Sequence, residues 1–243
     1  MQRSCNKERL RTLKGFTLIE LLVVVTIIAI LSLIGFSGAN QFIMMSKRTK
    51  CASNLRQIGV AIQLYAANNN GRFPMTSHTT GSSIEKAWVY QLEEYLGEGF
   101  DLIRVSPADP KSEQRIDAGG TSYILNSYLF VPEYDPFGNL ISQPYNRPAL
   151  IPRPSQTMLA FTIAEETPVG AQNDHTHSNR WTNWNAVLED ISPDLHRSGE
   201  PNADQTDGSS NYLFADGHVE TWDADQFKAK IEAGENPAYP PEK

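Results

Sequence analysis

The longest apolar segment of the chain runs from Phe16 to Phe36 and contains a single formal charge, at Glu20. It holds no proline and is rich in leucine, isoleucine and valine. A helix of this length rises roughly 30 Å at about 1.5 Å per residue, which matches the hydrocarbon core of a bilayer. The pattern therefore predicts that residues 16–37 form the membrane-spanning half of an N-terminal helix.

A helical pattern continues beyond this apolar segment. Apolar and aromatic residues recur at spacings of four, three, four and three, as on one helical face: Cys51, Leu55, Ile58, Ile62 and Tyr65. The pattern stops at Asn68-Asn69-Asn70-Gly71, a stretch typical of helix ends. We expect one helix from Phe16 to about Asn69, whose amphipathic half at residues 38–70 packs under a globular domain. A break near Gly38 into two helices is the alternative.

The remaining residues, 71–243, predict one α+β domain built on an antiparallel sheet. The expected elements, in chain order, are a helix at 84–95 with a capping box at Ser82 and Glu85, a loop at 106–110, strands at 123–131 and 158–164, an irregular segment at 132–154 between them, a polar excursion at 166–208 anchored by Trp181 and Trp184, and a final helix capped by Asp223 and Gln226 that buries Phe227 and Ile231.

Residues 211–222 predict a β-hairpin. Asp216-Gly217 lies between two strand-like runs, and glycine adopts the positive φ of a tight turn without steric cost. Because side chains alternate along a strand, Leu213 is expected on the face opposite Tyr212 and Phe214.

The charge pattern indicates the orientation of the chain. Residues 1–15 carry five basic residues and one acidic residue, a net charge of +4. A positive N-terminal flank tends to stay in the cytoplasm, which places residues 71–243 outside it as an extracytoplasmic domain. The whole chain has a net charge of −7, and an acidic domain is a poor match for nucleic-acid phosphates. No nucleic-acid partner is expected.

The run Gly15-Phe16-Thr17-Leu18-Ile19-Glu20-Leu21-Leu22, after a basic leader, resembles the class III leader of type IV pilins and type II secretion pseudopilins. The resemblance implies that a prepilin peptidase cuts after Gly15 and methylates the new N-terminal Phe16. It also implies a structural subunit and not an enzyme, anchored by a single pass in the inner membrane. Such a subunit assembles with other pilin or pseudopilin subunits, through an inner-membrane platform, into a filament. An ordinary signal anchor is the alternative.

Gly15, Phe16 and Glu20 are the expected processing and assembly residues. A carboxylate within a membrane is costly unless a cation meets it, and the amino group that cleavage creates on Phe16 is such a cation. We expect Glu20 of one subunit to meet this amino group on a neighbouring subunit and so set the axial register. Pairing within one chain is disfavoured, because more than a helical turn of backbone separates the two groups.

The chain has two cysteines, Cys5 and Cys51. Cys5 leaves with the leader under the proposed cleavage, so Cys51 then lacks an intrachain partner and is expected to be a small core residue. Near the C-terminus, Phe214-Ala215-Asp216-Gly217-His218-Val219 resembles the signature of a group of pilin-like proteins abundant in planctomycetes and verrucomicrobia. That group has a histidine shortly before the Asp-Gly, where His196 is the nearest candidate here, and often a cysteine in place of Ser106.

A different function remains open at this point: a membrane-anchored extracytoplasmic enzyme or metal-binding protein that uses the same leader. Its candidate ligands are His175, His177, His196, His218 and Asp216. Convergence of these histidines on one site would favour this alternative.

No cofactor is expected, although calcium is a possible ligand. Asn202, Asp204, Asp207 and Gly208 place oxygen atoms in a short loop, as calcium prefers. Their spacing departs from that of an EF-hand, and a solvated loop is the favoured interpretation.

Overall fold

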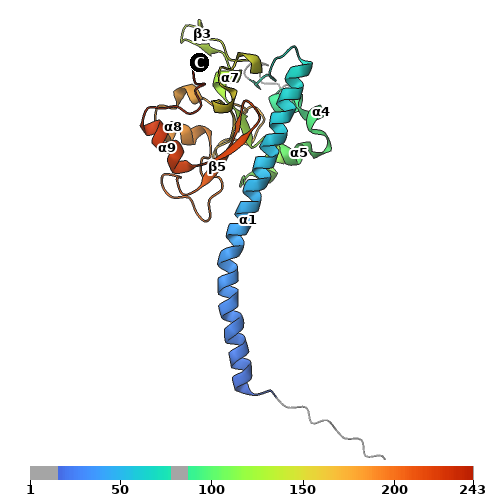
Figure 1. The fold of residues 1–243 in the computed structure, drawn as a ribbon, viewed down its shortest axis with the longest axis vertical. Coiled ribbons are helices and arrows are strands. Elements are labelled where there is room, and N and C mark those ends of the chain that lie inside the picture. Colours follow the sequence, from blue (N-terminus) through green and yellow to red (C-terminus); the bar gives the residue numbers. More distant parts are fainter. Residues whose placement is uncertain (1–15, 78–86, 243) are drawn as a thin grey trace, which may run out of the picture. The chain divides into compact units, whose positions relative to one another are not determined.

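The computed structural model describes residues 16–77 and 87–242, without the side chains of residues 33–39 (Figure 1). The chain divides into two compact units, Met1–Gln41 and Phe42–Lys243. The basic leader at 1–15 and the predicted capping box at Ser82 and Glu85 lie outside the described residues.

Helix α1 spans Leu18–Asn68, which confirms one continuous helix and shows that the alternative break near Gly38 is wrong. Just past its end, Asn70 and Gly71 have φ values of 56° and 71°. The amide of Gly71 donates a hydrogen bond to the carbonyl of Ala66 at 2.8 Å. A left-handed residue with a hydrogen bond back across the last turn is a common helix stop, and it confirms the predicted end.

The unit from Phe42 to Lys243 contains a four-stranded antiparallel sheet in the order β1-β4-β5-β6. Its strands are β1 (Tyr123–Leu125), β4 (Met158–Thr162), β5 (Ser209–Phe214) and β6 (Val219–Asp223). A second sheet pairs β2 (Glu133–Tyr134) with β3 (Leu140–Ser142). The short helices are α3 (Trp88–Gln91), α4 (Glu93–Leu96), α5 (Phe100–Ile103), α6 (Ser112–Asp117), α7 (Ser127–Phe130), α8 (Trp184–Asp190) and α9 (Ala224–Glu232). A helix followed by an antiparallel sheet confirms the predicted α+β class.

Each face of the four-stranded sheet buries its own hydrophobic core. One core joins α1 to the sheet through Cys51, Leu55, Ile58, Ile62, Leu125, Leu159 and Leu213. The other joins α8 and α9 to the opposite face through Phe161, Trp181, Trp184, Tyr212, Phe214, Phe227 and Ile231. In Figure 1, α8 and α9 lie together beside β5. Leu213 thus lies on the face opposite Tyr212 and Phe214, as predicted. Trp181 and Trp184 are buried, also as predicted.

Cys51 is a fully buried member of the first core, as predicted. Desolvation raises the pKa of its thiol, so the reactive thiolate is disfavoured. Ser106 lies beside this thiol. A cysteine at position 106, as the resembled group often has, would therefore be a neighbour of Cys51.

Helix α1 approaches the β5–β6 turn closely at Gly59. A Cβ atom on Gly59 would lie 2.9 Å from Cδ1 of Leu213 and 3.6 Å from Cα of Gly217. One turn later, Nε2 of Gln63 donates a hydrogen bond to the carbonyl of Ala215 at 3.0 Å. The small residue on α1 lets the helix lie directly on the hairpin, and the glutamine then holds the turn in place.

The predicted strand at 123–131 is wrong beyond Leu125, because the chain turns into α7. The side chain of Asn126 accepts a hydrogen bond from the amide of Tyr128 and so caps this helix. Its Nδ2 atom donates to the carbonyls of Met158 and Ala238, each at 2.7 Å. These long-range hydrogen bonds favour the turn over a longer strand. The segment 132–154 is also more regular than predicted, since it contains the β2–β3 pair.

Two helix predictions are corrected in part. The described end of the predicted helix at 84–95 is split into α3 and α4, although Trp88 and Leu92 are fully buried as expected. The predicted capping by Asp223 is wrong, because its side chain makes no cap hydrogen bond to α9. Asp223 still belongs to β6, and the first amide of α9, on Ala224, donates to the carbonyl of Gly208 instead.

Candidate functional site

The start of α1 contains the predicted processing and assembly residues. Gly15 lies outside the described residues, whereas Phe16 is described and 74% exposed. From Phe16 to Leu31, every large apolar side chain is at least 44% exposed. A contiguous apolar surface of this extent is typical of an interaction surface.

Thr17 and Glu20 form a reciprocal capping box at the first turn of α1. The amide and the hydroxyl of Thr17 both donate to Oε2 of Glu20, at 2.9 and 2.7 Å. In return, the amide of Glu20 donates to Oγ1 of Thr17 at 3.3 Å. This role of Thr17 was not predicted, although the Thr-x-x-Glu spacing is typical of a capping box.

The capping box brings the Glu20 carboxylate close to the beginning of its own chain. Its Oε2 atom accepts a hydrogen bond from the amide of Thr17. This amide is one residue away from the nitrogen of Phe16 that cleavage would free. The side chain of Glu20 folds back toward the N-terminus, so the backbone separation does not by itself disfavour pairing within one chain. No described residue donates a hydrogen bond to Oε1, so this oxygen is available for a second donor.

In residues 16–77 and 87–242, no helix is both long and apolar enough to cross a membrane. The expected span at residues 16–37 stays a prediction.

The Asp216-Gly217 turn confirms the predicted hairpin. Gly217 has a φ of 93°, and the amide of Phe214 donates to the carbonyl of His218 at 2.9 Å. The His218 ring stacks on Phe214, and its nitrogens contact the carboxylates of Asp216 and Glu220. Partial desolvation acts to lower the pKa of His218, but the hydrogen bonds with the two carboxylates outweigh it and raise the pKa. The position of Asp216 in the turn and its contact with His218 explain the presence of this aspartate without a metal ion.

Of the four candidate histidines, the structure brings two together. The rings of His175 and His177 lie 5.4 Å apart, and their Nδ1 atoms contact Asp174 at 2.8 Å and Asp190 at 3.1 Å. The hydrogen bond with Asp190 raises the pKa of His177. Within the described ranges, no group of three or more His, Cys, Asp or Glu side chains could hold a metal ion.

His196 is buried in a position that disfavours its charged form. Both ring nitrogens are buried without a hydrogen-bond partner among the described residues. Desolvation first, and then the nearby charge of Arg48, lower the pKa of His196 from 6.5 to about 4. The imidazole is therefore neutral in the folded protein at neutral pH.

Acid should destabilise the protein through His196. In the unfolded chain this side chain takes up a proton near pH 6.5, whereas the folded protein resists protonation down to about pH 4. Stability from this group is therefore present above pH 6.5 and lost as the pH falls toward 4, by on the order of 3 kcal/mol. Urea unfolding of the full chain in detergent across this range should show the loss.

His196→Leu removes the titrating group, so its stability should change less with pH over the same range. His218→Gln is the matched control and should keep the acid-dependent loss. An equally steep loss in His196→Leu would contradict the assignment.

The loop considered for calcium is held by contacts within the chain. Oδ2 of Asp204 pairs with Nζ of Lys228 at 2.8 Å, and Oδ1 of Asn202 accepts a hydrogen bond from the amide of Thr206 at 2.8 Å. Side-chain oxygens of two of the four predicted ligand residues are thus already engaged. Calcium binding by this loop, with Asp207 and Gly208, stays a prediction.

Comparison with known proteins gives one match. The family described as the prokaryotic N-terminal methylation motif matches residues 11–36, which include Gly15, Phe16 and Glu20. No curated protein and no solved structure matches the chain. The C-terminal run at 214–219 lies outside the matched residues, so its family resemblance stays a prediction. The chain thus carries the N-terminal methylation motif at residues 11–36, and the long helix and antiparallel sheet that follow it form the α+β arrangement expected of a type IV pilin-like protein.

Proposed function

We propose that the chain is a structural subunit that assembles through α1 into a type II secretion pseudopilus or a type IV pilus-like filament. The methylation motif at residues 11–36 carries this proposal, because it contains both the Gly15-Phe16 junction and Glu20. The partners are the prepilin peptidase, other pilin or pseudopilin subunits and an inner-membrane assembly platform. The role is structural and not catalytic, and it needs no cofactor.

The exposed apolar surface of α1 supports this role. Side chains from Phe16 to Leu31 need an apolar environment, which lipid provides before assembly and neighbouring helices provide afterwards. In this arrangement the chain crosses the inner membrane once, with a cytoplasmic N-terminus and an extracytoplasmic globular domain. The positive charge of residues 1–15 supports the same orientation.

The capping box suggests how Glu20 serves two partners. Oε2 holds Thr17 of the same chain and keeps the first turn of α1 formed. Oε1 then accepts a hydrogen bond from the free amino group of Phe16 on a neighbouring subunit. Two charges that are each costly in lipid neutralise each other, and the helices take one axial register. In an unassembled subunit, the amino group of Phe16 pairs with Glu20 of its own chain. Assembly replaces this intramolecular pair with a pair between neighbouring subunits.

Intact-mass analysis of the membrane-extracted protein tests the processing step. In a host with the peptidase, we expect loss of residues 1–15 and addition of one methyl group to Phe16. Gly15→Leu should block cleavage and Gly15→Ala should slow it less, because a bulky side chain fits a tight peptidase pocket poorly. Retention of residues 1–15 in the wild-type protein would overturn the proposal.

A further inference from the structure

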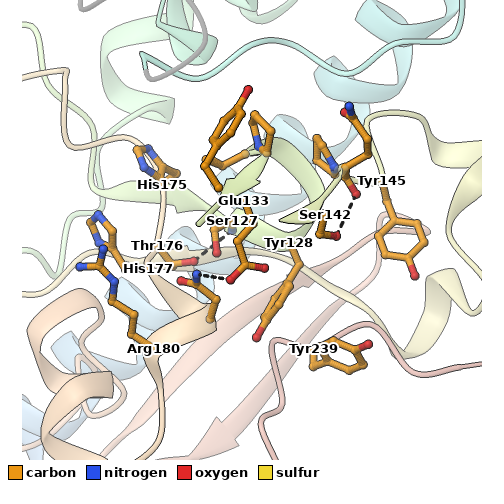
Figure 2. Close-up of a pocket in the computed structure, with 16 residues that line it drawn as sticks. Ser127, Tyr128, Glu133, Ser142, Tyr145, His175, Thr176, His177, Arg180 and Tyr239 are labelled. Atoms are coloured by element: carbon orange, nitrogen blue, oxygen red, sulfur yellow. Dashed lines mark hydrogen bonds between the residues drawn. The ribbon is translucent and has the colours of Figure 1, made fainter. Parts of the chain in front are cut away.

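A cavity of about 810 Å³ opens on the globular unit beside α7 and the β2–β3 pair (Figure 2). Its volume lies within the roughly 300–1,000 Å³ typical of small-molecule sites. Tyr128, Glu133, Tyr145, Arg180 and Tyr239 are among the side chains that line it. We propose that this cavity binds neutral oligosaccharides.

Tyrosines form one side of the cavity. Figure 2 shows Tyr145 and Tyr239 on the same side, with Tyr128 next to Tyr239. The rings of Tyr128 and Tyr239 pack edge to face with centroids 5.1 Å apart, which orients both. No described residue hydrogen-bonds the hydroxyl groups of these three tyrosines. A tyrosine offers an apolar ring face and a polar hydroxyl, which suits the C–H face and the hydroxyl groups of a sugar ring.

Charged and polar groups form the other side. Figure 2 shows His177 and Arg180 across the cavity from Tyr145 and Tyr239, with Glu133 between them. Oε1 of Glu133 accepts a hydrogen bond from Nδ2 of Asn179 at 3.2 Å, which orients the carboxylate. Arg180 can only donate hydrogen bonds and an ionised Glu133 can only accept them. A ligand with many hydroxyl groups satisfies both, because each hydroxyl donates and accepts.

Two buried residues that line the cavity, Ser127 and Thr176, are held by Ser178, which is not itself a lining residue. Oγ of Ser178 lies 2.8 Å from Oγ of Ser127 and 3.0 Å from Oγ1 of Thr176. All three residues are buried. Lining residues that are held by hydrogen bonds of their own give a ligand a fixed surface, so less ordering is needed on binding.

The charges argue for a neutral ligand. An anionic ligand would meet the carboxylate of Glu133, and a cationic ligand would meet the guanidinium of Arg180. Proline-rich peptides also bind aromatic grooves, but proline has no N–H group to donate to Glu133. Such a peptide would use the tyrosines and leave the polar side poorly matched.

Binding can be tested with the full-length protein in a zwitterionic detergent that has no sugar headgroup. The probes are immobilised neutral glucans, mannans and xylans, with polygalacturonate and a decaproline peptide as the competing classes. We expect binding to at least one neutral glycan and none to the other two classes. Calorimetric titration with a hexasaccharide of the glycan that binds then gives the affinity.

Three variants test the cavity itself. Tyr239→Leu, Glu133→Gln and Arg180→Gln should each weaken the titrated affinity by about tenfold, as expected for one lost contact in a site. Phe137→Leu is the matched control, because this aromatic residue is 89% exposed and does not line the cavity. It should bind like the wild type.

Absence of binding to every neutral glycan would overturn the proposal. So would a preference for polygalacturonate or decaproline, or neutral-glycan binding that all three cavity variants retain. Tyr239 is half exposed, and equal melting temperatures of variants and wild type will show that the fold is intact. The proposed filament role stands apart from this test, since it depends on α1 and on cleavage at Gly15.

Discussion

Glu20→Gln will leave cleavage intact and abolish ordered assembly. The amide side chain keeps the length of the carboxylate and can still accept the hydrogen bond from the amide of Thr17, so the cap of α1 remains. It carries no charge and cannot neutralise the amino group of Phe16 on a neighbouring subunit. In cells that express the assembly machinery, crosslinking of membrane-embedded subunits should give ladders for the wild type and only monomer for the variant.

Thr17→Val tests the helix cap separately from the charge of Glu20. It removes the hydroxyl of the capping box, which weakens the helix start by about 1 kcal/mol, but it leaves the carboxylate of Glu20 in place. We expect this variant to keep its ladders. Glu20→Leu should insert into the membrane more readily and yet assemble no better than Glu20→Gln.

The three variants distinguish a role of the Glu20 charge from a role of the helix cap. Normal ladders in both Glu20 variants would mean that the carboxylate is a tolerated charge, and the register argument would be wrong. Loss of ladders in Thr17→Val as well would show that assembly also requires the helix cap.

Arg115→Met will destabilise the globular unit by about 3–5 kcal/mol, as expected when one partner of a buried ion pair is lost. Nε of Arg115 lies 2.7 Å from Oδ2 of Asp109, and both side chains are almost fully buried. Oδ2 of Asp109 also accepts a hydrogen bond from the hydroxyl of Ser122 at 2.6 Å. Without Arg115, that hydrogen bond remains but the carboxylate is left as an unpaired buried charge. Urea unfolding of the full chain in detergent measures the loss.

A surface ion pair provides the matched control. Nζ of Lys228 lies 2.8 Å from Oδ2 of Asp204, but the Asp204 side chain is 61% exposed. Lys228→Met should therefore change stability much less than Arg115→Met does. The double variant Asp109→Leu with Arg115→Met should recover part of the loss, because it leaves no unpaired charge. If Arg115→Met costs no more than Lys228→Met, the buried pair does not stabilise the fold.

Features that depend on neighbouring residues were predicted well from the sequence. The end of α1 follows from asparagine and glycine residues that adopt positive φ, and the hairpin follows from Asp216-Gly217. The face of Leu213 follows from strand alternation. The capping box of Thr17 and Glu20 is equally local, because its partners are three residues apart, but it was not predicted. In each case, short-range sterics and hydrogen bonds determine the result.

Features that join distant parts of the chain were decided only by the tertiary structure. The side chain of Asn126 ends β1 early because it reaches carbonyl groups of Met158 and Ala238. Asp109 and Arg115 are only six residues apart, but the guanidinium of Arg115 also reaches carbonyl groups of residues 164–168, and this contact with a distant segment was not predicted. The cavity is lined by residues from Ser127 to Tyr239, so no local motif predicts it. The N-terminal motif and its helix are thus determined by the sequence itself. The burial of the ion pair and the form of the cavity depend on packing, because segments that are distant in the sequence enclose both.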